Sequence, residues 1–295
     1  MKKIYKAMGI GAAALLIGLL SGCGGGSGGT SESSSATGTV ALSLTDAPVD
    51  NEAVSAVYVI FDSLQYQYAD GNDSWQDVNL TESRTVNLLA LQDGNTTLLN
   101  QVDLPAGEIA QVRFMIDTEK CYVVVDEQNK TLEVPSGDQT GYKAVGGFTI
   151  PAGGTVNVTA DFDLRKSLTI TGNGRYILKP TIKIVDNSEV GEINGTVTVD
   201  TNGSTAVIYA YEDGTWDSNE TNATNNFSHA VSSTKVSNGD YILPWLSAGV
   251  YDLVVASYDV NGDFEAVMGF VNNVTVSPNQ TITQDIIDPL DDYLP

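Results

Sequence analysis

Residues 54–68 read VSAVYVIFDSLQYQY, and this stretch decides the fold class. Val54–Phe61 is rich in β-branched and aromatic residues, and apolar side chains then recur at every second position as far as Tyr68. Such alternation is typical of a β-strand with one buried face. The turn-forming residues ADGND follow at 69–73, so we predict a long strand that ends in a tight turn.

Similar stretches recur on both sides of this strand and predict β structure throughout. Further strands are expected at 40–44, 109–116, 122–125, 130–134, 148–150, 155–162 and 176–185, and then at 192–199, 206–211, 241–244, 251–258, 264–271 and 281–287. Gly, Asn, Asp and Pro separate them at short intervals, which is typical of a sandwich or barrel. One short helix is expected at 84–91, and the polar segment 215–233 is expected to be a long exposed loop.

A change in charge marks a boundary near residues 186–189. From Glu192 to Pro295 the chain has 15 acidic residues and a single basic one. We therefore predict an all-β chain in which a signal peptide and a flexible linker precede two β-sandwich domains in tandem. The expected bounds are 1–22 for the signal peptide, 23–38 for the lipidated cysteine and linker, 39–187 for the first domain and 190–288 for the second.

The N-terminus has the three parts of a secretory signal. Three lysines precede an apolar run, Met8–Leu20, which is too short to span a bilayer comfortably. The run ends at Leu20-Ser21-Gly22-Cys23, which resembles the lipobox of bacterial lipoproteins. This resemblance implies cleavage after Gly22 and acyl chains, such as palmitate, on Cys23. The protein would then be held in a membrane of the cell envelope by its lipid, at the end of a Gly/Ser-rich leash.

The residue after the cysteine bears on the location of the protein. Gly24 resembles the sorting signal for the outer membrane, so we expect the outer membrane rather than the inner one. Whether the chain faces the periplasm or the cell surface stays open.

Composition limits the partners and the chemistry. Removal of residues 1–22 takes away three of the 14 basic residues and none of the 37 acidic ones, which leaves a net charge of −26. Such a charge argues against binding to nucleic acid. The chain has one histidine, His229, so Ser-His-Asp catalysis and histidine-rich zinc sites are excluded or nearly so. With lipid on Cys23, Cys121 has no disulfide partner, and we expect it to be a buried thiol.

Several separated motifs of the first domain form a recognisable set. They are Leu44-Thr45-Asp46-Ala47-Pro48, Leu104-Pro105-Ala106-Gly107, Asp161-Phe162-Asp163, Ser167 and Leu178-Lys179-Pro180. Together they resemble the bacterial lipoprotein family called domain of unknown function 4382, over about residues 38–186. The resemblance implies a β-rich domain outside the cytoplasm, and it implies no activity.

The second domain carries a different pattern. Asn238-Gly239-Asp240-Tyr241-Ile242-Leu243 is followed by Leu246-Ser247-Ala248-Gly249-Val250-Tyr251-Asp252-Leu253. This is similar to the carboxypeptidase regulatory-like, transthyretin-like sandwich, in which the two segments are adjacent strands. We expect Gly239 and Gly249 to supply turn geometry. The resemblance implies a non-catalytic accessory module.

Three carboxylates are candidates for a site. Asp161 and Asp163 flank Phe162, so both point to one face of a strand, and Asp46 ends another strand. If the three meet, they need a cation or a basic partner to remain ionised. Calcium fits such oxygen ligands, a structural polar network is the simpler interpretation, and a catalytic pair is a further alternative. The basic candidates are Arg113, Arg165, Lys166 and Lys179.

Two further features have a functional and a structural interpretation. Trp216 stands in the polar segment 215–233 and is the candidate for stacking against a sugar. The residues DVNGD at 259–263 partly resemble a calcium loop, but a hairpin turn is the better interpretation.

These features favour a non-catalytic lipoprotein that binds, supports or adheres at the cell envelope, in contact with an envelope protein or polysaccharide. We expect that it is not an enzyme. Two alternatives stay open: a carboxylate-based hydrolase of envelope polysaccharide, and an adhesin or matrix component that calcium stiffens.

Overall fold

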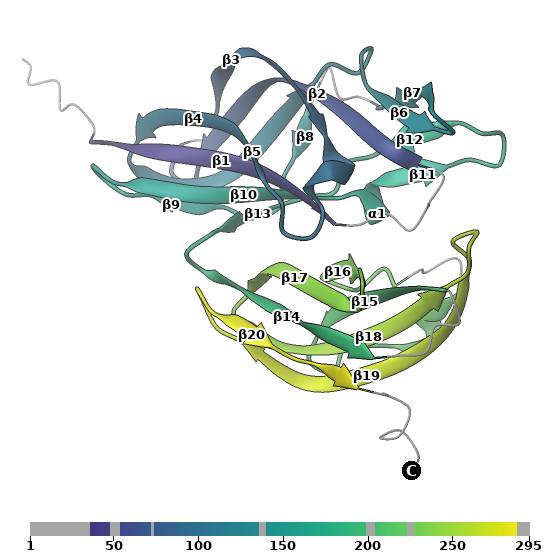
Figure 1. Ribbon diagram of the computed structural model, residues 1–295. Helices are drawn as coiled ribbons and strands as arrows, with labels where there is room; N and C mark the ends of the chain where they lie inside the picture. Colours follow the sequence, from purple (N-terminus) through teal and green to yellow (C-terminus); the bar gives the residue numbers. More distant parts are fainter. Residues whose placement is uncertain are drawn as a thin grey trace, which may run out of the picture. The chain divides into compact units, whose positions relative to one another are not determined.

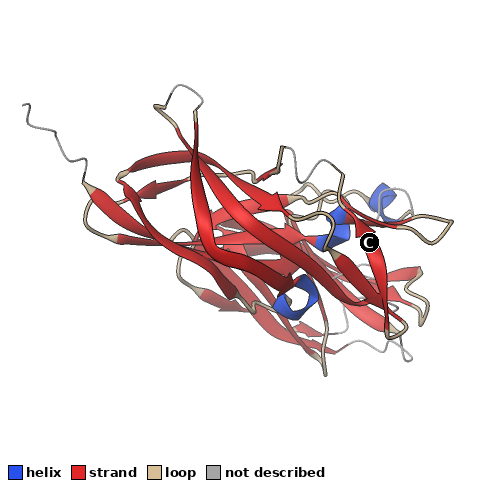
Figure 2. Cartoon of the chain, turned by 90° about the horizontal axis from the view of Figure 1, so that it is seen from above, coloured by secondary structure: helices blue, strands red, loops and turns tan. Residues whose placement is uncertain are grey.

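The computed structural model describes residues 36–47, 54–71, 74–135, 140–198, 204–222 and 227–287. The predicted signal peptide and residues 23–35 of the predicted linker, with Cys23, lie outside these residues. Thr37 and Gly38, which were predicted to belong to the linker, are instead the first residues of strand β1. Strands account for nearly all the regular structure, as Figure 2 shows in red, which confirms the all-β prediction. No helix in the described ranges is long and apolar enough to cross a membrane.

The first half of the chain forms two sheets, which we call the N-terminal sheet pair (Figure 1). One sheet has the strand order β13-β10-β1-β4, and the nine-stranded sheet has the order β11-β12-β7-β6-β2-β5-β8, with β3 on β2 and β9 on β5. The elements are β1 Thr37–Ala47, β2 Val54–Tyr68, β3 Trp75–Asn87, the 3-10 helix η1 Leu88–Leu91, β4 Thr97–Pro105, β5 Gly107–Ile116, β6 Tyr122–Val125, β7 Gln128–Glu133, β8 Tyr142–Lys143, β9 Phe148–Ile150, β10 Thr155–Asp163, α1 Leu164–Ser167, β11 Leu168–Ile170, β12 Tyr176–Leu178 and β13 Ile182–Asp186.

Aromatic side chains join the two sheets of this pair. Phe61 and Phe114 come from the nine-stranded sheet and Phe162 from β10, and all three are fully buried. The ring of Phe162 makes edge contacts to both others with centroids 5.5 Å apart. Such pairs add to the stabilisation that burial of apolar area already gives, so the core fixes β10 against β2 and β5.

The predicted helix at 84–91 is wrong for its first half. Arg84 and Val86 belong to β3, where they pair with Phe61 and Val59 of β2. Only the leucine-rich end forms a turn of 3-10 helix, η1. Long-range pairing has overridden the helix-like spacing of the leucines, as tertiary contacts often do for short segments.

The second half of the chain forms the C-terminal sheet pair (Figure 1). One sheet has the order β17-β14-β20, with β21 on β14, and the other has the order β16-β15-β18-β19. The elements are β14 Val190–Thr198, β15 Thr205–Glu212, the 3-10 helix η2 Ser218–Thr221, β16 Ser232–Lys235, β17 Asp240–Ser247, β18 Gly249–Tyr258, β19 Phe264–Val276, β20 Thr281–Thr283 and β21 Ile286–Ile287.

In the C-terminal sheet pair, the side chains that alternation along the strands predicted to be buried do lie in the core. Tyr241 and Leu243 of β17 and Tyr251 and Leu253 of β18, in the other sheet, are all buried in one cluster with Ile193 of β14. The turn before Tyr241 has the predicted left-handed geometry, with φ of 54° at Asn238 and 87° at Gly239. Gly249 differs from the prediction, because it begins strand β18 and has no left-handed φ.

The second face of β15 is covered as well. Tyr209 and Tyr211 point away from the main core and pack with Phe227 and Ala230 from the segment that follows η2. This corrects the expectation that 215–233 is wholly an exposed loop. The segment is polar in composition, but its few apolar residues are the ones that contact the sheet, because burial of aromatic rings outweighs the polar surroundings.

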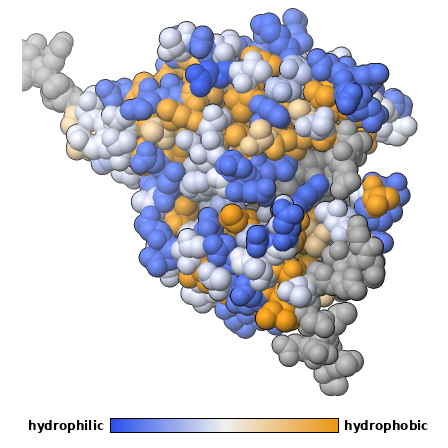
Figure 3. All heavy atoms as spheres, in the orientation of Figure 1, coloured by the Kyte–Doolittle hydropathy of each residue, from blue (hydrophilic) through white to orange (hydrophobic). Residues whose placement is uncertain are grey.

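Strand β19 is an edge strand that pairs with β18 alone among the described strands. The pairing shifts register at three places, between Tyr251 and Leu253, Val255 and Ala256, and Ser257 and Tyr258. Exposed large apolar side chains are spread over different elements, for example Leu98, Val145 and Val260. On the face drawn in Figure 3, hydrophilic and apolar residues are interspersed, which suits an acidic chain in water.

Candidate functional site

The register of β1 and β10 places the three candidate carboxylates. These strands are parallel neighbours, with Asp46 opposite buried Phe162 and with Thr45 opposite Asp161. Because neighbours in register share a face of a sheet, Asp46 faces the core, whereas Asp161 and Asp163 face away from it. Asp46 and Asp161 nevertheless both line one small cavity, which Asp163 does not line, so the three carboxylates do not all meet at one point. The described residues contain no group of three or more His, Cys, Asp or Glu side chains placed to hold a metal ion.

Asp46 and Asp163 instead fix the two sides of the short helix α1. The main-chain N–H of Leu164 donates to Asp46 Oδ1 at 3.1 Å, and that of Lys166 donates to Asp163 Oδ1 at 3.1 Å. Both bonds satisfy main-chain donors at a helix start, which otherwise lack partners. Two motifs that lie 118 residues apart in the chain thus meet at one turn.

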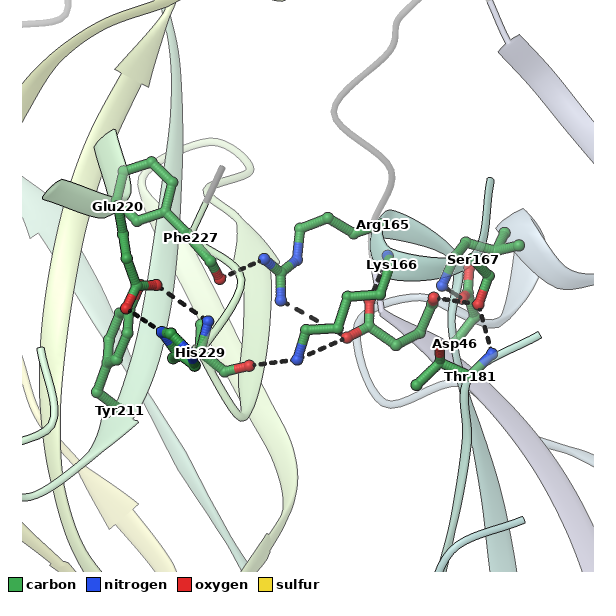
Figure 4. Close-up of polar contacts among 12 residues, drawn as sticks. Asp46, Arg165, Lys166, Ser167, Thr181, Tyr211, Glu220, Phe227 and His229 are labelled. Carbon is green, nitrogen blue, oxygen red and sulfur yellow. Dashed lines mark hydrogen bonds and ion pairs between the residues drawn. The ribbon is translucent and has the colours of Figure 1, made fainter. Parts of the chain in front are cut away.

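Ser167 ties the same turn to the segment before β13. Its hydroxyl donates to the carbonyl oxygen of Asp163 at 2.6 Å and accepts from the N–H of Thr181 at 2.8 Å. Ser167 is buried, so both bonds are shielded from water. Asp46 of the Asp-Ala-Pro motif, Asp163 of the Asp-Phe-Asp motif and Ser167 therefore form one hydrogen-bonded cluster around α1 (Figure 4).

Basic residues of α1 neutralise Asp163. Its Oδ2 lies 3.5 Å from Arg165 Nη2 and 3.4 Å from Lys166 Nζ. The alternative in which protein cations pair with the carboxylates is therefore confirmed for Asp163. Burial lowers the pKa of Lys166, an effect that Asp163 opposes.

The same two basic side chains reach the C-terminal sheet pair. Arg165 Nη1 donates to the carbonyl oxygen of Phe227 at 2.7 Å, and Lys166 Nζ donates to that of Ala230 at 2.7 Å (Figure 4). The guanidinium also lies 5.3 Å from the ring centroid of Tyr209. We call this set of contacts between α1 and residues 227–230 the α1 junction.

A buried glutamate holds the far side of the junction. Glu220 accepts from the Tyr211 hydroxyl at 3.0 Å and from the His229 N–H at 3.0 Å, and its Oε1 lies 2.6 Å from His229 Nδ1. Burial, with Glu220 adding to it, raises the pKa of Tyr211 far above its usual range. Glu220 is not among the residues predicted for the site. The signal that the segment folds back on the sheet was Phe227, an aromatic residue isolated in a polar segment.

Trp216 is part of this packing. Its ring stacks on Phe227 with centroids 5.6 Å apart and meets the edge of Tyr211 at 5.1 Å. The side chain is half-buried, so the stacking partner that we find is Phe227 of the same chain. The role of Trp216 in stacking against a sugar stays a prediction.

Asp161 lies on the same face of β10 as Asp163 but beside a small cavity. It lines this cavity of about 10 Å³ together with Asp46, Asp93, Ser233 and Trp245. Desolvation, with a further contribution from Asp163, raises the pKa of Asp161 to about 7. A space of this size holds about one water molecule, so it has no room for a substrate.

Two other sequence interpretations are confirmed. Cys121 is a free, buried thiol whose Sγ donates to the carbonyl oxygen of Asp117, and burial raises its pKa to about 11. Residues 259–263 form the hairpin turn between β18 and β19, where Asp259 Oδ1 accepts from the N–H groups of Asn261 and Asp263.

The sheets and their cores define an all-β protein of the sandwich type. Within it, residues 37–180 match the family model described as "Domain of unknown function (DUF4382)". This match confirms the resemblance that the motifs of the N-terminal part gave. No curated protein matches the chain.

Solved structures give weak likenesses over most of the chain. The minor pilin GBS52 of Streptococcus agalactiae is 11% identical, with 84% of this chain and 94% of that chain covered and a TM-score of 0.21. The tip fimbrial protein Mfa3 of Porphyromonas gingivalis is 8% identical, with 84% and 94% covered and a TM-score of 0.22. The major pilin of Streptococcus pyogenes is 11% identical, with 85% and 99% covered and a TM-score of 0.16. At these values the likeness carries no conclusion about function.

Proposed function

We propose that this protein is a non-catalytic binding or adhesion module of the cell envelope, held there by lipid on Cys23. The observation that carries the proposal is the use of the motif carboxylates. Asp46 and Asp163 are bonded to the main chain of α1, and Asp163 is also paired with two cations. These groups stabilise a turn and a junction between the sheet pairs, so their role is structural, as expected for a non-catalytic module.

The remaining candidate for catalysis is Asp161. A raised pKa is a common property of catalytic acids, but a general acid must also reach its substrate. The cavity beside Asp161 has a volume of only about 10 Å³. This favours a binding module over the alternative hydrolase of envelope polysaccharide.

Anchoring and binding are tested separately. Cells grown with labelled palmitate should give a labelled, membrane-bound chain, and Cys23→Ala should remove both the label and the membrane association. Cys121→Ala is the matched control and should change neither. A Cys23→Ala chain that stays labelled and membrane-bound would contradict the lipid anchor.

Catalysis is tested on the purified full chain with a broad panel of polysaccharides and peptides. We expect binding to a component of the panel without turnover. Hydrolysis that Asp161→Asn abolishes would overturn the proposal and support the hydrolase.

A further inference from the structure

Two adjoining hollows lie where the turn at 186–189 leads into β14. The first has a volume of about 450 Å³ and is lined by β9, β10 and this turn. The second has a volume of about 320 Å³ and is lined by the start of β14, by β17 and by the turn before β20. Both are lined by Asn187 and Asn279, so we treat them as one continuous feature, the asparagine groove. Its size is within the range of small-molecule sites in proteins.

The groove has a distinctive chemistry. Amides come from Asn157, Asn187, Asn279 and Gln280, and carboxyl groups come from Asp186 and Glu192. The residues that line the two hollows include no lysine, arginine or histidine. Anionic ligands are normally held by such cations, so the groove is unsuited to them. Amides offer donors and acceptors side by side, which matches hydroxyl groups that both donate and accept.

Several of these groups are held in place before a ligand arrives. Asn187 Oδ1 accepts from the Thr159 hydroxyl at 2.9 Å, and Asn279 Nδ2 donates to the carbonyl oxygen of Ser188 at 2.9 Å. The other end of each amide, Nδ2 of Asn187 and Oδ1 of Asn279, is therefore oriented and open to a ligand. Groups fixed in this way lose little freedom on binding, which favours affinity.

Trp245 lines the groove from an irregular strand position. Leu246 pairs with Gly191 and Leu243 pairs with Ile193, so Pro244 and Trp245 form a bulge opposite Glu192. Trp245 has a left-handed φ of 59°, which is a strained conformation for a bulky side chain. Its indole N–H is buried and has no hydrogen-bond partner among the described residues, so the accessible part of the side chain is its apolar ring. Bulges often re-aim a side chain beside a functional site.

We infer that the asparagine groove binds a neutral oligosaccharide. Amides and carboxyl groups would exchange hydrogen bonds with the sugar hydroxyls, and Trp245 would offer an apolar ring face. This inference rests on the proposed function and names the class of ligand that the module takes.

The test uses the full chain, purified in a detergent without a sugar headgroup. The chain is first screened on an array of neutral gluco-, galacto- and manno-configured oligosaccharides, together with uronic-acid and sulfated oligosaccharides. Each neutral oligosaccharide that binds is then titrated. We expect binding to neutral members and none to acidic ones. Asn157→Ala should weaken binding about fivefold, as expected for a lost hydrogen bond between neutral groups. Trp245→Gly should abolish detectable binding.

The variants are chosen to leave the fold intact. Asn157 is exposed, and glycine adopts the left-handed φ of position 245 freely. Gln101→Ala, on the edge strand β4, is the matched control and should bind as the wild type does. Should Trp245→Gly fail to fold by its melting curve, Asn157→Ala alone decides.

Three results overturn the inference in different ways. If Asn157→Ala and Trp245→Gly both bind neutral oligosaccharides as the wild type does, the sugar site lies elsewhere. A wild-type chain that binds only an acidic glycan or an envelope protein removes the neutral ligand while the proposed binding function stands. A chain that binds no member of any panel removes both.

Discussion

Arg165 donates a hydrogen bond of 2.7 Å to the carbonyl oxygen of Phe227, a residue 62 positions further along the chain. Arg165 belongs to α1 in the N-terminal sheet pair, and Phe227 lies on the outer face of the C-terminal sheet pair. The guanidinium side chain is only 2% exposed, so solvent hardly screens the contact. The α1 junction should therefore contribute to stability far more than an ion pair at the surface.

Replacement of Arg165 tests this contribution. Arg165→Met should lower the free energy of unfolding by about 2–3 kcal/mol, because it leaves a buried carbonyl oxygen and part of the Asp163 charge without a partner. Urea unfolding measures the change. Arg175→Met, which removes the exposed pair with Glu133, is the control and should leave the unfolding midpoint almost unchanged. Equal effects of the two changes would contradict a special role for the junction.

Glu220 should act together with Tyr211. Glu220→Ala is expected to lower the free energy of unfolding by about 2 kcal/mol, since a buried hydroxyl donor and a main-chain N–H lose their acceptor. Tyr211→Phe removes the donor itself. In the double variant the loss should be smaller than the sum of the two single losses, because the two residues share one bond. Strictly additive losses, measured by urea unfolding, would rule out this coupling.

The raised pKa of Asp161 predicts a dependence of stability on pH. The folded carboxyl group has a pKa of about 7, whereas the unfolded group has the usual value of about 4, so between these values the folded state binds more protons. The contribution of Asp161 is thus fully present below pH 4 and is lost as pH rises through 7. Asp161→Asn should therefore be more stable than the wild type at pH 8 by about 2 kcal/mol, and nearly equal to it at pH 4, after allowance for partial exposure.

Urea unfolding of both chains between pH 4 and pH 8 gives this comparison. Asp70→Asn, in an exposed turn, is the control. A difference between Asp161→Asn and the wild type that stays constant over the whole range would show that Asp161 does not titrate in this window.

Cys121 should be slow to react in the folded protein. The thiol is buried and its pKa is raised to about 11, so little thiolate exists at pH 8. In a Cys23→Ser chain, a disulfide reagent that releases a coloured thiolate should detect no thiol in buffer and one thiol in urea. Rapid reaction in buffer would mean that the strands around Cys121 open readily.

We expect the melting temperature in calcium to equal the melting temperature in magnesium, which serves as the control. A ligand that binds only the folded state must raise the melting temperature. Asp46 and Asp161 line a cavity of only about 10 Å³. The described residues contain no group of three or more acidic, His or Cys side chains placed to hold a metal ion, so we expect no calcium site there. A rise of several degrees with millimolar calcium, reversed by a chelator, would restore the hypothesis of a calcium-stiffened adhesin.

Strand positions were the most predictable part of this protein. The bounds of β6 and β9 agree with the prediction to the residue, and β2 ends at Tyr68 as the alternation indicated. Period-two patterning works here because each of these strands has one face in a core. The expected strand 176–185 is divided into β12 and β13, because Pro180 lacks an N–H and interrupts the pairing.

Side-chain roles at the site were less predictable. Alternation correctly put Asp161 and Asp163 on one face, but the side that Asp46 takes depends on the register between β1 and β10, which are far apart in the chain. A shift by one residue would reverse that result. Glu220 could not be found at all, because its environment is created by Tyr211 and by the return of Phe227 to the sheet.

Membrane-bound copies of a protein meet one another more often than copies in free solution. A long, regular edge strand would let such neighbours pair with one another through main-chain hydrogen bonds. The three register shifts along β19 break up that row of donors and acceptors. We therefore expect β19 to resist edge-to-edge association. Under the proposed lipid anchor, many copies could then share one membrane while each copy stays separate.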